Sequence, residues 1–461
     1  MTDPMKLKTL FLVALLSIAI NSTAQEIPTG DLLVRNATVL TITNGTLENT
    51  DVLIQDGIIT AVGEQLNVSQ EIPVIDATGM YVMPGIIDAH SHIGISNVNE
   101  SSAPVTAQVS VGDVLNPYSI AIYRALAGGV TSSHVMHGSA NVIGGQNETI
   151  KHRWGLLDPD ELRMAGAPRT IKFALGENPT RVHGRGNNKR PASRMGVEYV
   201  LRETFAKAQR YQEAWVQYEE NAKINPRAIS PAYNSQLEVM ADILSGDIII
   251  HCHSYRADEI LMLLGVLEDF GVDQITLQHV NEGFKIAPEL AEFGATASVF
   301  ADWWGYKFEV YYSTAYNAAI LTRNGVLTSI NSDSGELNRH LYHEAAKSQK
   351  YGDLSDDEAL ALITINPAIQ LGIGDRIGSI EVGKEGDLAI FDRHPLSVYA
   401  INQKTVVDGI IYFDIETDTD DMRLIVDPES KVDTAVLHSH DDTHQCLYEG
   451  SLDLYDFLES S

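Results

Sequence analysis

The chain has 461 residues, of which 44% are hydrophobic, so it is long and apolar enough to form one large domain with a smaller one. Lysine and arginine total 32 against 62 aspartate and glutamate, and the formal charge of -30 argues against nucleic acid and anionic membrane surfaces as partners. The two cysteines, Cys252 and Cys446, have no zinc-finger spacing and are too few for a disulfide framework.

The N-terminus has the pattern of a secretory signal peptide. Lys6 and Lys8 precede an apolar segment over residues 10–20, and Ser-Thr-Ala follows at 22–24. We expect residues 1–24 to be removed and the protein to be exported to the periplasm or the extracellular space. A membrane anchor is the alternative, but the apolar segment is short of the roughly 20 residues that a spanning helix needs. The sequence therefore predicts no membrane span in the mature protein.

Both ends of the chain carry a β pattern. Residues 31–82 alternate short apolar runs with hairpin turns such as Asn44-Gly45 and Asp56-Gly57, and residues 377–413 return to β character. Together they predict a small sheet domain built from residues 25–83 and 377–425. The chain becomes strongly acidic after Asp414, and we expect residues 426–461 to form an acidic C-terminal extension.

Between these ends the chain alternates apolar strands with helical stretches, which is typical of βα units around a parallel sheet. The predicted strands are 130–135, 170–175, 247–251, 274–279, 296–300 and 326–333. The predicted helices are 119–127, 198–223, 257–270, 287–293, 337–351 and 356–364. Residues 84–376 are therefore predicted to form an α/β barrel domain.

Polar residues end several of these strands, where the chemistry of such barrels is located. His90 and His92 end the first apolar run, and their i, i+2 spacing places both imidazoles on one face of a strand. His251, His279 and Asp333 end later strands. The span from His90 to Asp333 is close to the roughly 250 residues of a complete eight-stranded barrel. This nitrogen-rich set favours Zn2+, as one or two divalent ions, over an oxygen-preferring cation.

These motifs resemble the amidohydrolase superfamily, in particular its imidazolonepropionase-like metal-dependent hydrolases. The resemblance rests on residues 82–92 (VMPGIIDAHSH), 127–131 (AGGVT) and 378–392 (GSIEVGKEGDLAIFD), and it extends over roughly residues 32–413. It implies a (β/α)8 TIM barrel with a small β-sandwich domain formed by the N- and C-terminal segments. It also implies hydrolysis of amide or related C-N bonds at a site with one or two metal ions.

The resemblance implies metal ligands at His90, His92, His251, His279 and Asp333. The bridging ligand is Glu177 or a carboxylated Lys172, and we favour Glu177 because it lies in the Gly-Glu-Asn-Pro block at residues 176–179. On the strand that contains His251, His253 is the alternative ligand. We favour His251 because it ends the apolar run directly, which leaves His253 to contact the substrate.

The remaining site residues follow from the same reasoning. Asp333 is expected to act as general base and acid on an attacking water, with His279 as a second catalytic residue that polarises the substrate carbonyl. Arg181, His183 and Arg185 follow Glu177 on a long loop and are candidates to bind a substrate carboxylate. Gln146, in the Gly-Gly-Gln-Asn loop after the second strand, is a further candidate for substrate binding.

The sequence thus predicts an exported metal-dependent amidohydrolase that acts on a small amide, peptide or cyclic amide. A deaminase of an aromatic amine would use the same constellation, and a catalytically silent exported binding barrel is the alternative from another class. The intact set of five ligands argues against the silent barrel. We expect a small-molecule or short-peptide substrate, and the sequence leaves the oligomeric state open, a homo-oligomer included.

Overall fold

The computed structural model describes residues 27–185, 189–305 and 307–418. The predicted signal peptide (1–24) and acidic extension (426–461) lie outside the described residues, so both stay predictions. Among the described residues, no helix is long and apolar enough to cross a membrane.

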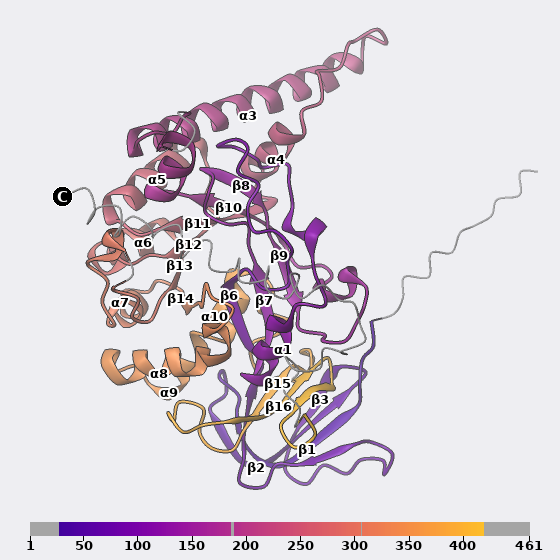
Figure 1. Ribbon diagram of the computed structural model, residues 1–461. Helices are drawn as coiled ribbons and strands as arrows, with labels where there is room; N and C mark the ends of the chain where they lie inside the picture. Colours follow the sequence, from indigo (N-terminus) through magenta and orange to yellow (C-terminus); the bar gives the residue numbers. More distant parts are fainter. Residues whose placement is uncertain (1–26, 186–188, 306, 419–461) are drawn as a thin grey trace, which may run out of the picture.

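Segments from both ends of the described chain meet in one mixed, eight-stranded sheet, at the lower end of Figure 1. Its order is β17-β16-β15-β5-β1-β2-β3, with β4 paired to β1. The strands are β1 (Leu32–Leu40), β2 (Thr46–Gln55), β3 (Ile58–Gly63), β4 (Val74–Asp76), β5 (Tyr81–Pro84), β15 (Leu388–Phe391), β16 (Asn402–Val407) and β17 (Ile410–Asp414). Asp56 and Gly57 both have positive φ, as the predicted hairpin turn requires. The ladder runs as one sheet, so the two-layer form of the predicted sandwich is not confirmed.

The central part of the chain is α/β with mixed sheets. A six-stranded sheet runs β14-β13-β12-β11-β10-β8, and a three-stranded sheet runs β6-β7-β9. The strands are β6 (Ile86–Ser91), β7 (Val130–Val135), β8 (Ile143–Gln146), β9 (Glu148–Lys151), β10 (Arg169–Ala174), β11 (Ile248–Ser254), β12 (Ile275–His279), β13 (Thr296–Val299) and β14 (Thr328–Ile330). From β10 to β14 every neighbouring pair is parallel, and so are β6 and β7.

One position of the predicted parallel barrel holds an antiparallel segment instead. β9 is antiparallel to β7 and β8 is antiparallel to β10. The physical reason is the connection from β7 to β8, residues 136–142, which is shorter than the dozen or more residues that a parallel crossover needs. Asn147, between β8 and β9, donates its backbone N–H to the carbonyl of Thr170, which joins the two sheets.

The other edges of the two sheets meet at β6 and β14. No ladder among the described residues pairs these two strands, so a closed eight-stranded barrel is not confirmed. The chain after β14 nevertheless bonds to β6, because the N–H of Asp333 donates to the carbonyl of His90 at 3.0 Å. This contact brings the last strand beside the first one.

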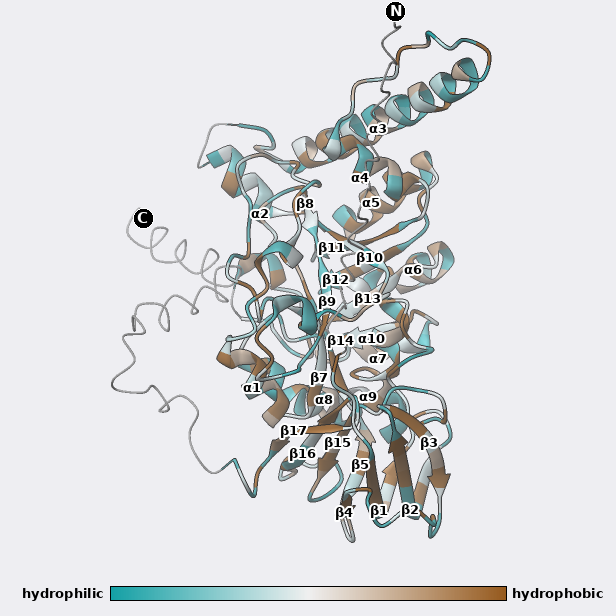
Figure 2. Ribbon diagram, turned by 90° about the vertical axis from the view of Figure 1, so that its right-hand side faces the viewer, coloured by the Kyte–Doolittle hydropathy of each residue, from teal (hydrophilic) through white to brown (hydrophobic). Residues whose placement is uncertain are grey.

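Of the helices, α4 to α7 line the outer side of the six-stranded sheet, whereas α1 packs against β7 and the small sheet (Figure 1). Their bounds are α1 (Ile120–Ala127), α2 (Glu177–Thr180), α3 (Arg194–Ala222), α4 (Ser235–Leu244), α5 (Ala257–Phe270), α6 (Ala287–Phe293), α7 (Asn317–Arg323), α8 (Leu341–Gly352), α9 (Asp356–Ala361) and α10 (Ile365–Gln370). The predictions for α1, α5 and α6 agree with these bounds to within one residue, whereas α4, α7 and α10 were not predicted. The 29-residue α3 extends beyond the body of the protein (Figure 2).

A buried ion cluster joins the three-stranded sheet to the small sheet. Lys151 at the end of β9 is fully buried, and its Nζ lies 3.0 Å from the carboxylate of Asp387 and also contacts Asp408 and Glu385. Arg153 Nε lies 2.7 Å from the second oxygen of Asp408. Burial alone would lower the pKa of Lys151, but the carboxylates raise it above its ordinary value, so the ammonium stays charged.

We expect the Lys151→Met variant to lose about 3 to 5 kcal/mol of unfolding free energy, because it leaves buried carboxylates without their cation. Lys223→Met is the matched control, since Lys223 is largely exposed and should change stability by less than about 0.5 kcal/mol. Urea denaturation followed by circular dichroism measures both. Equal stability of the two variants would contradict a structural role for the cluster.

Candidate metal centre

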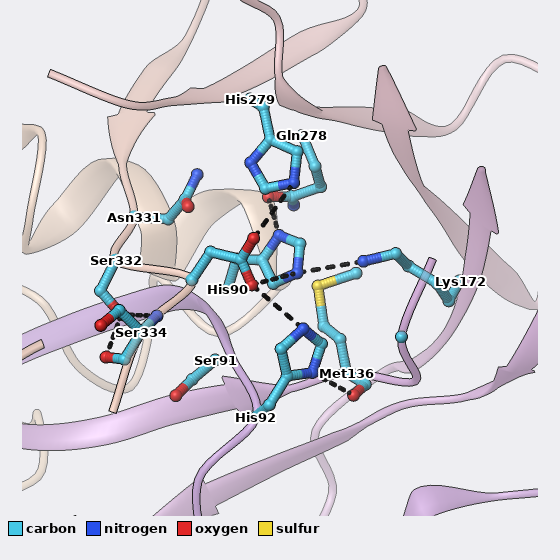
Figure 3. Close-up of polar contacts among 12 residues, drawn as sticks. His90, Ser91, His92, Met136, Lys172, Gln278, His279, Asn331, Ser332 and Ser334 are labelled. Atoms are coloured by element: carbon cyan, nitrogen blue, oxygen red, sulfur yellow. Dashed lines mark hydrogen bonds and ion pairs between the residues drawn. The ribbon is translucent and has the colours of Figure 1, made fainter. Parts of the chain in front are cut away.

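His90 and His92 converge as the spacing in the sequence predicts (Figure 3). Both lie at the end of β6, both are buried, and their ring centroids are 5.1 Å apart. Nδ1 of His92 donates to the carbonyl of Met136 at 2.8 Å. A ring that donates through Nδ1 presents the lone pair of Nε2, which is the atom that faces the interior.

Asp333 faces these two histidines from the far end of the barrel sequence. Its Oδ1 lies 3.1 Å from Nε2 of His92 and 3.6 Å from Nε2 of His90, and its Oδ2 lies 3.7 Å from Nε2 of His279. His90, His279 and Asp333 each offer one ligand atom within 4.8 Å of the others. Asp333 has φ of 45°, a left-handed conformation that aspartate adopts more readily than most non-glycine residues.

Asp88 fixes the segment that carries Asp333. Its buried carboxylate accepts the N–H of Ser332 at 3.1 Å, the hydroxyl of Ser332 at 2.5 Å and the N–H of His90 at 3.3 Å. Burial raises the pKa of Asp88 to about 7, against the opposing effect of the Ser332 hydrogen bonds. Asp88 was not singled out from the sequence, although it lies two residues before His90.

Gln278 and His279 both point into the site, which strand alternation alone would forbid. His279 has φ of 71° and Val280 has φ of 46°, so the backbone turns as β12 ends and redirects the histidine. The amide oxygen of Gln278 accepts from Nδ1 of His90 at 3.1 Å, and its amide nitrogen lies 3.0 Å from Nδ1 of His251. Gln278 thus orients two imidazoles from different strands, but in opposite senses: His90 donates to it and keeps the lone pair of Nε2, whereas His251 accepts from it and, when neutral, carries its proton on Nε2.

The clustered histidines are neutral. Burial lowers the pKa of His279 to about 3, although Asp333 opposes this effect. Burial also holds the pKa values of His90, His251 and His253 well below the ordinary value, with Lys172 adding to the shift of each. Neutral imidazoles keep a lone pair, which is the form that binds metal ions.

His251 and His253 both face the interior. The strand β11 continues to Ser254, past the predicted end at His251, so the i, i+2 spacing places both rings on one face. The ring of His253 lies 4.8 Å from that of His279, and the ring of His251 lies 4.3 Å from that of His134. The geometry brings both histidines to the centre, and the choice between them stays open.

Lys172, and not Glu177, contacts the centre. The Nζ of Lys172 lies 3.0 Å from Nε2 of His90, and the side chain is fully buried (Figure 3). Glu177 begins α2, is partly exposed and pairs with Lys307 at 3.3 Å. The structure therefore places Glu177 away from the centre, after a turn at Gly176 with φ of 77°, and the identity of the bridging ligand stays a prediction.

The predicted substrate residues Arg181, Arg185, His183 and Gln146 lie in different parts of the structure. Arg181 and Arg185 line a cavity of about 420 Å³ together with Glu177. His183 is buried, with its Nε2 3.3 Å from the amide oxygen of Asn141. Gln146 is not at the centre, because its strand is antiparallel to β10 and therefore ends beside Arg169 at the start of β10, where its amide oxygen accepts a hydrogen bond at 3.0 Å.

Aromatic rings form one wall of the centre. Phe300 stacks on His279 with centroids 4.4 Å apart, and Trp303 stacks on Phe300 at 4.3 Å. Tyr255 belongs to the same buried cluster as Phe300, and its ring centroid lies 5.4 Å from that of His279. The sequence shows Tyr255 and Phe300 only as residues that follow strand ends, with no signal of their own.

The donor set fits a transition-metal ion. Among the described residues, His253 and His279 have no hydrogen-bond partner at either ring nitrogen, and Nε2 of His251 has none. Buried polar atoms normally have partners, so their convergence beside the carboxylate of Asp333 indicates a cation between them. Imidazole-rich sets with one carboxylate suit zinc and similar ions rather than magnesium or calcium.

The chain is similar to several known proteins. A family profile described as "Amidohydrolase family" matches residues 312–425. The crystal structure of an amidohydrolase from Thermotoga maritima MSB8 superposes with a TM-score of 0.77 at 34% identity, covering 83% of this chain and 100% of that chain.

Two sequence relatives extend the comparison. Amidohydrolase tasK of Hapsidospora irregularis is 32% identical over 399 residues, which are 79% of this chain but 40% of that protein. Imidazolonepropionase of Thermoplasma volcanium is 23% identical over 398 residues, 80% of this chain and 91% of that protein. The chain thus spans less than half the length of tasK.

We expect Asp88→Ala to cost about 3 kcal/mol of unfolding free energy, since it removes the acceptor of two buried N–H groups, those of Ser332 and His90, at roughly 1–3 kcal/mol each. Ser332→Ala is the control, because it removes a single hydroxyl and should cost about 1 kcal/mol. Chemical denaturation of both variants measures the difference. If Asp88→Ala were no less stable than Ser332→Ala, the carboxylate would not hold this segment.

Proposed function

This chain belongs to the amidohydrolase family, and from this premise we propose that it is a metal-dependent hydrolase of C-N bonds in a small amide, peptide or cyclic amide. The observation that carries the proposal is the meeting of His90, His92, His279 and Asp333, from three separate strand ends, with their nitrogen and oxygen atoms facing one point.

His90, His92, His279 and Asp333 would hold one or two divalent ions, with Zn2+ favoured by the imidazole-rich set. One imidazole of β11, His251 or His253, completes the set. The sequence favours His251, but the amide N–H of Gln278 donates to its Nδ1, which puts the proton of the neutral ring on Nε2, so His253 stays the alternative. The bound ion would lower the pKa of water from about 16 toward neutrality and so supply a nucleophile.

Lys172 is the candidate bridging ligand. A neutral amine in this buried position can add carbon dioxide, which forms an N–C bond, gives a carbamate and releases one proton. The carbamate would replace a buried cation by an anion among the imidazoles, and its two oxygens suit a site with two ions. The contact between Lys172 and His90 at 3.0 Å supports this position.

Asp333 is the proposed general base and acid. Its carboxylate lies within 3.1–3.7 Å of three imidazoles, so it can accept a proton at the point where the nucleophile forms and return it to the leaving nitrogen. His279 lies between Asp333 and the ring of Phe300, where it can polarise the substrate carbonyl. The alternatives are a deaminase of an aromatic amine on the same site and a silent binding barrel.

Export remains a proposal as well. It rests on the signal-peptide pattern of residues 1–24, and the mass of the protein secreted by its host would test it.

We expect Asp333→Asn to lower kcat by about 100-fold or more, because the substitution keeps the shape of the side chain but removes the base. Asp353→Asn is the control, since Asp353 is exposed at the end of α8 in a left-handed conformation that asparagine tolerates. Carboxylate formation from dipeptides, N-acyl amino acids and cyclic amides is assayed beside ammonia release from aromatic amines. Turnover of the amines alone would support the deaminase, and full metal content without any turnover would support the silent barrel.

We expect Lys172→Ala to reduce bound metal by about tenfold or more at equal free zinc, whereas Glu177→Ala should retain it. The reason is that Lys172 contacts His90 while Glu177 pairs with Lys307 outside the centre. Metal content after dialysis against buffered zinc measures both. Loss of metal from Glu177→Ala with retention in Lys172→Ala would restore Glu177 as the bridging ligand.

A further inference from the structure

A chain of hydrogen bonds links four strands at the candidate metal centre. Nζ of Lys172 on β10 lies 3.0 Å from Nε2 of His90 on β6 (Figure 3). Nδ1 of His90 lies 3.1 Å from the amide oxygen of Gln278 on β12, and the amide nitrogen of Gln278 lies 3.0 Å from Nδ1 of His251 on β11. All four side chains are fully buried, so each of these contacts matters to the atoms that make it.

The direction of this chain is set at His90. An ammonium group has donors and no lone pair, so Lys172 donates to Nε2 of His90. A metal ion at the same atom would require the same lone pair. A neutral imidazole carries its proton on one nitrogen, so the proton of His90 is on Nδ1 and is donated to the amide oxygen of Gln278. The tautomer of His90 is therefore the same with the lysine or with a metal ion as its partner.

Gln278 passes this direction on to β11. A carboxamide has one oxygen and one nitrogen, so when the oxygen accepts from His90 the NH2 group faces His251. Nδ1 of His251 must then accept, which leaves the proton of that neutral ring on Nε2. Two imidazoles that share one carboxamide in this way have opposite tautomers, and only one of them presents a lone pair at Nε2.

His253 is under no such constraint. It lies two residues after His251 on β11, and its ring lies 4.8 Å from that of His279. Among the described residues, neither ring nitrogen of His253 has a hydrogen-bond partner, and Nε2 of His251 has none either. The two histidines of β11 therefore offer different groups to the centre, a lone pair from His253 and an N–H from His251.

We propose that Gln278 is a positioning residue that assigns these roles: it makes His90 a metal ligand and His251 a hydrogen-bond donor, and so selects His253 as the ligand from β11. The inference rests on the proposed function for the metal ion, whereas the tautomers do not require the ion. His251 pairs with Lys172 in the ladder between β10 and β11, so its N–H can bind an acceptor oxygen of the substrate beside that lysine.

Nuclear magnetic resonance tests the tautomers directly. Long-range proton–nitrogen correlation spectra of protein with isotope-labelled histidine distinguish rings protonated at Nδ1 from rings protonated at Nε2, and His90→Gln and His251→Gln assign the two rings. After treatment with a chelator, we expect His90 to be protonated at Nδ1 and His251 at Nε2. Gln278→Glu should move the proton of His251 to Nδ1, because a carboxylate has only acceptors. A proton on Nδ1 of His251 in the unmodified protein would overturn the proposal.

Zinc binding separates positioning from packing. Gln278→Met keeps the approximate volume but removes both hydrogen bonds, so we expect it to bind zinc about tenfold or more weakly. Gln278→Glu should bind zinc at least as tightly as the unmodified protein, since it accepts from both rings. A role in packing alone predicts the reverse order, because a buried carboxylate is harmful where methionine is tolerated. Gln212→Met is the control, since Gln212 bonds Ser245 at an exposed position of α3 and should leave zinc binding unchanged.

Removal of each histidine of β11 tests which one is the ligand. At equal free zinc, His253→Gln should reduce bound zinc by about tenfold or more, whereas His251→Gln should retain it. The reverse result would overturn the proposal. If either variant does not fold, anomalous diffraction from the zinc-loaded unmodified protein decides, with a peak about 2.0–2.2 Å from a ring nitrogen of His253 expected and one at His251 contradicting.

The outcomes separate this inference from the proposed function. A protein that shows the opposite tautomers and the expected order of zinc binding but hydrolyses nothing would uphold the role of Gln278 and reject the proposed function. An active hydrolase in which His251 is protonated at Nδ1 would uphold the proposed function and reject this inference.

Discussion

The hydrogen bond from the N–H of Asp333 to the carbonyl of His90 joins the two ends of the barrel sequence, and the candidate centre depends on it. The carboxylate follows a strand of the six-stranded sheet and the first pair of imidazoles ends a strand of the three-stranded sheet, so this contact joins two separate sheets. The hydrogen bonds from Ser332 to Asp88 form a second connection between the same two segments. The left-handed conformation of Asp333 then directs its carboxylate toward His90, His92 and His279. A short backbone contact thus places the only carboxylate of the cluster.

Electrostatics explains why the centre is built from neutral groups. A buried imidazolium would be costly to desolvate, so burial keeps the histidines unprotonated and their lone pairs available. Lys172 is the exception, because its amine is buried beside His90. Among the clustered ligands of the described residues, Asp333 supplies the carboxylate. Addition of carbon dioxide would convert this amine to an anion, and this chemistry supports the proposal that Lys172 is the bridging ligand.

Local patterns in the sequence were enough to place several parts of the site. The i, i+2 spacing places His90 and His92 on one face because side chains alternate along any strand. The alternation of apolar strands and helical stretches predicted the bounds of α5, β12 and α6 to within one residue. The antiparallel β8–β9 segment was missed, although the short connection over residues 136–142 excludes a crossover. The side chains of Gln278 and His279 both point inward because His279 and Val280 have positive φ values. Neither residue type favours that conformation, so the sequence does not predict it. The sequence favoured Glu177 over Lys172 because of the Gly-Glu-Asn-Pro block at residues 176–179. The direction in which the chain turns at Gly176 cannot be read from the spacing of residues.

The central claim is that a metal ion lies between the side chains of His90, His92 and Asp333. Anomalous diffraction at the zinc edge from crystals of the zinc-loaded protein tests it most directly. The account predicts a peak about 2.0–2.2 Å from Nε2 of His90, Nε2 of His92 and a carboxylate oxygen of Asp333, the ordinary range for zinc bound to nitrogen and oxygen. Strong density elsewhere on the molecule, with none among these three side chains, would contradict it.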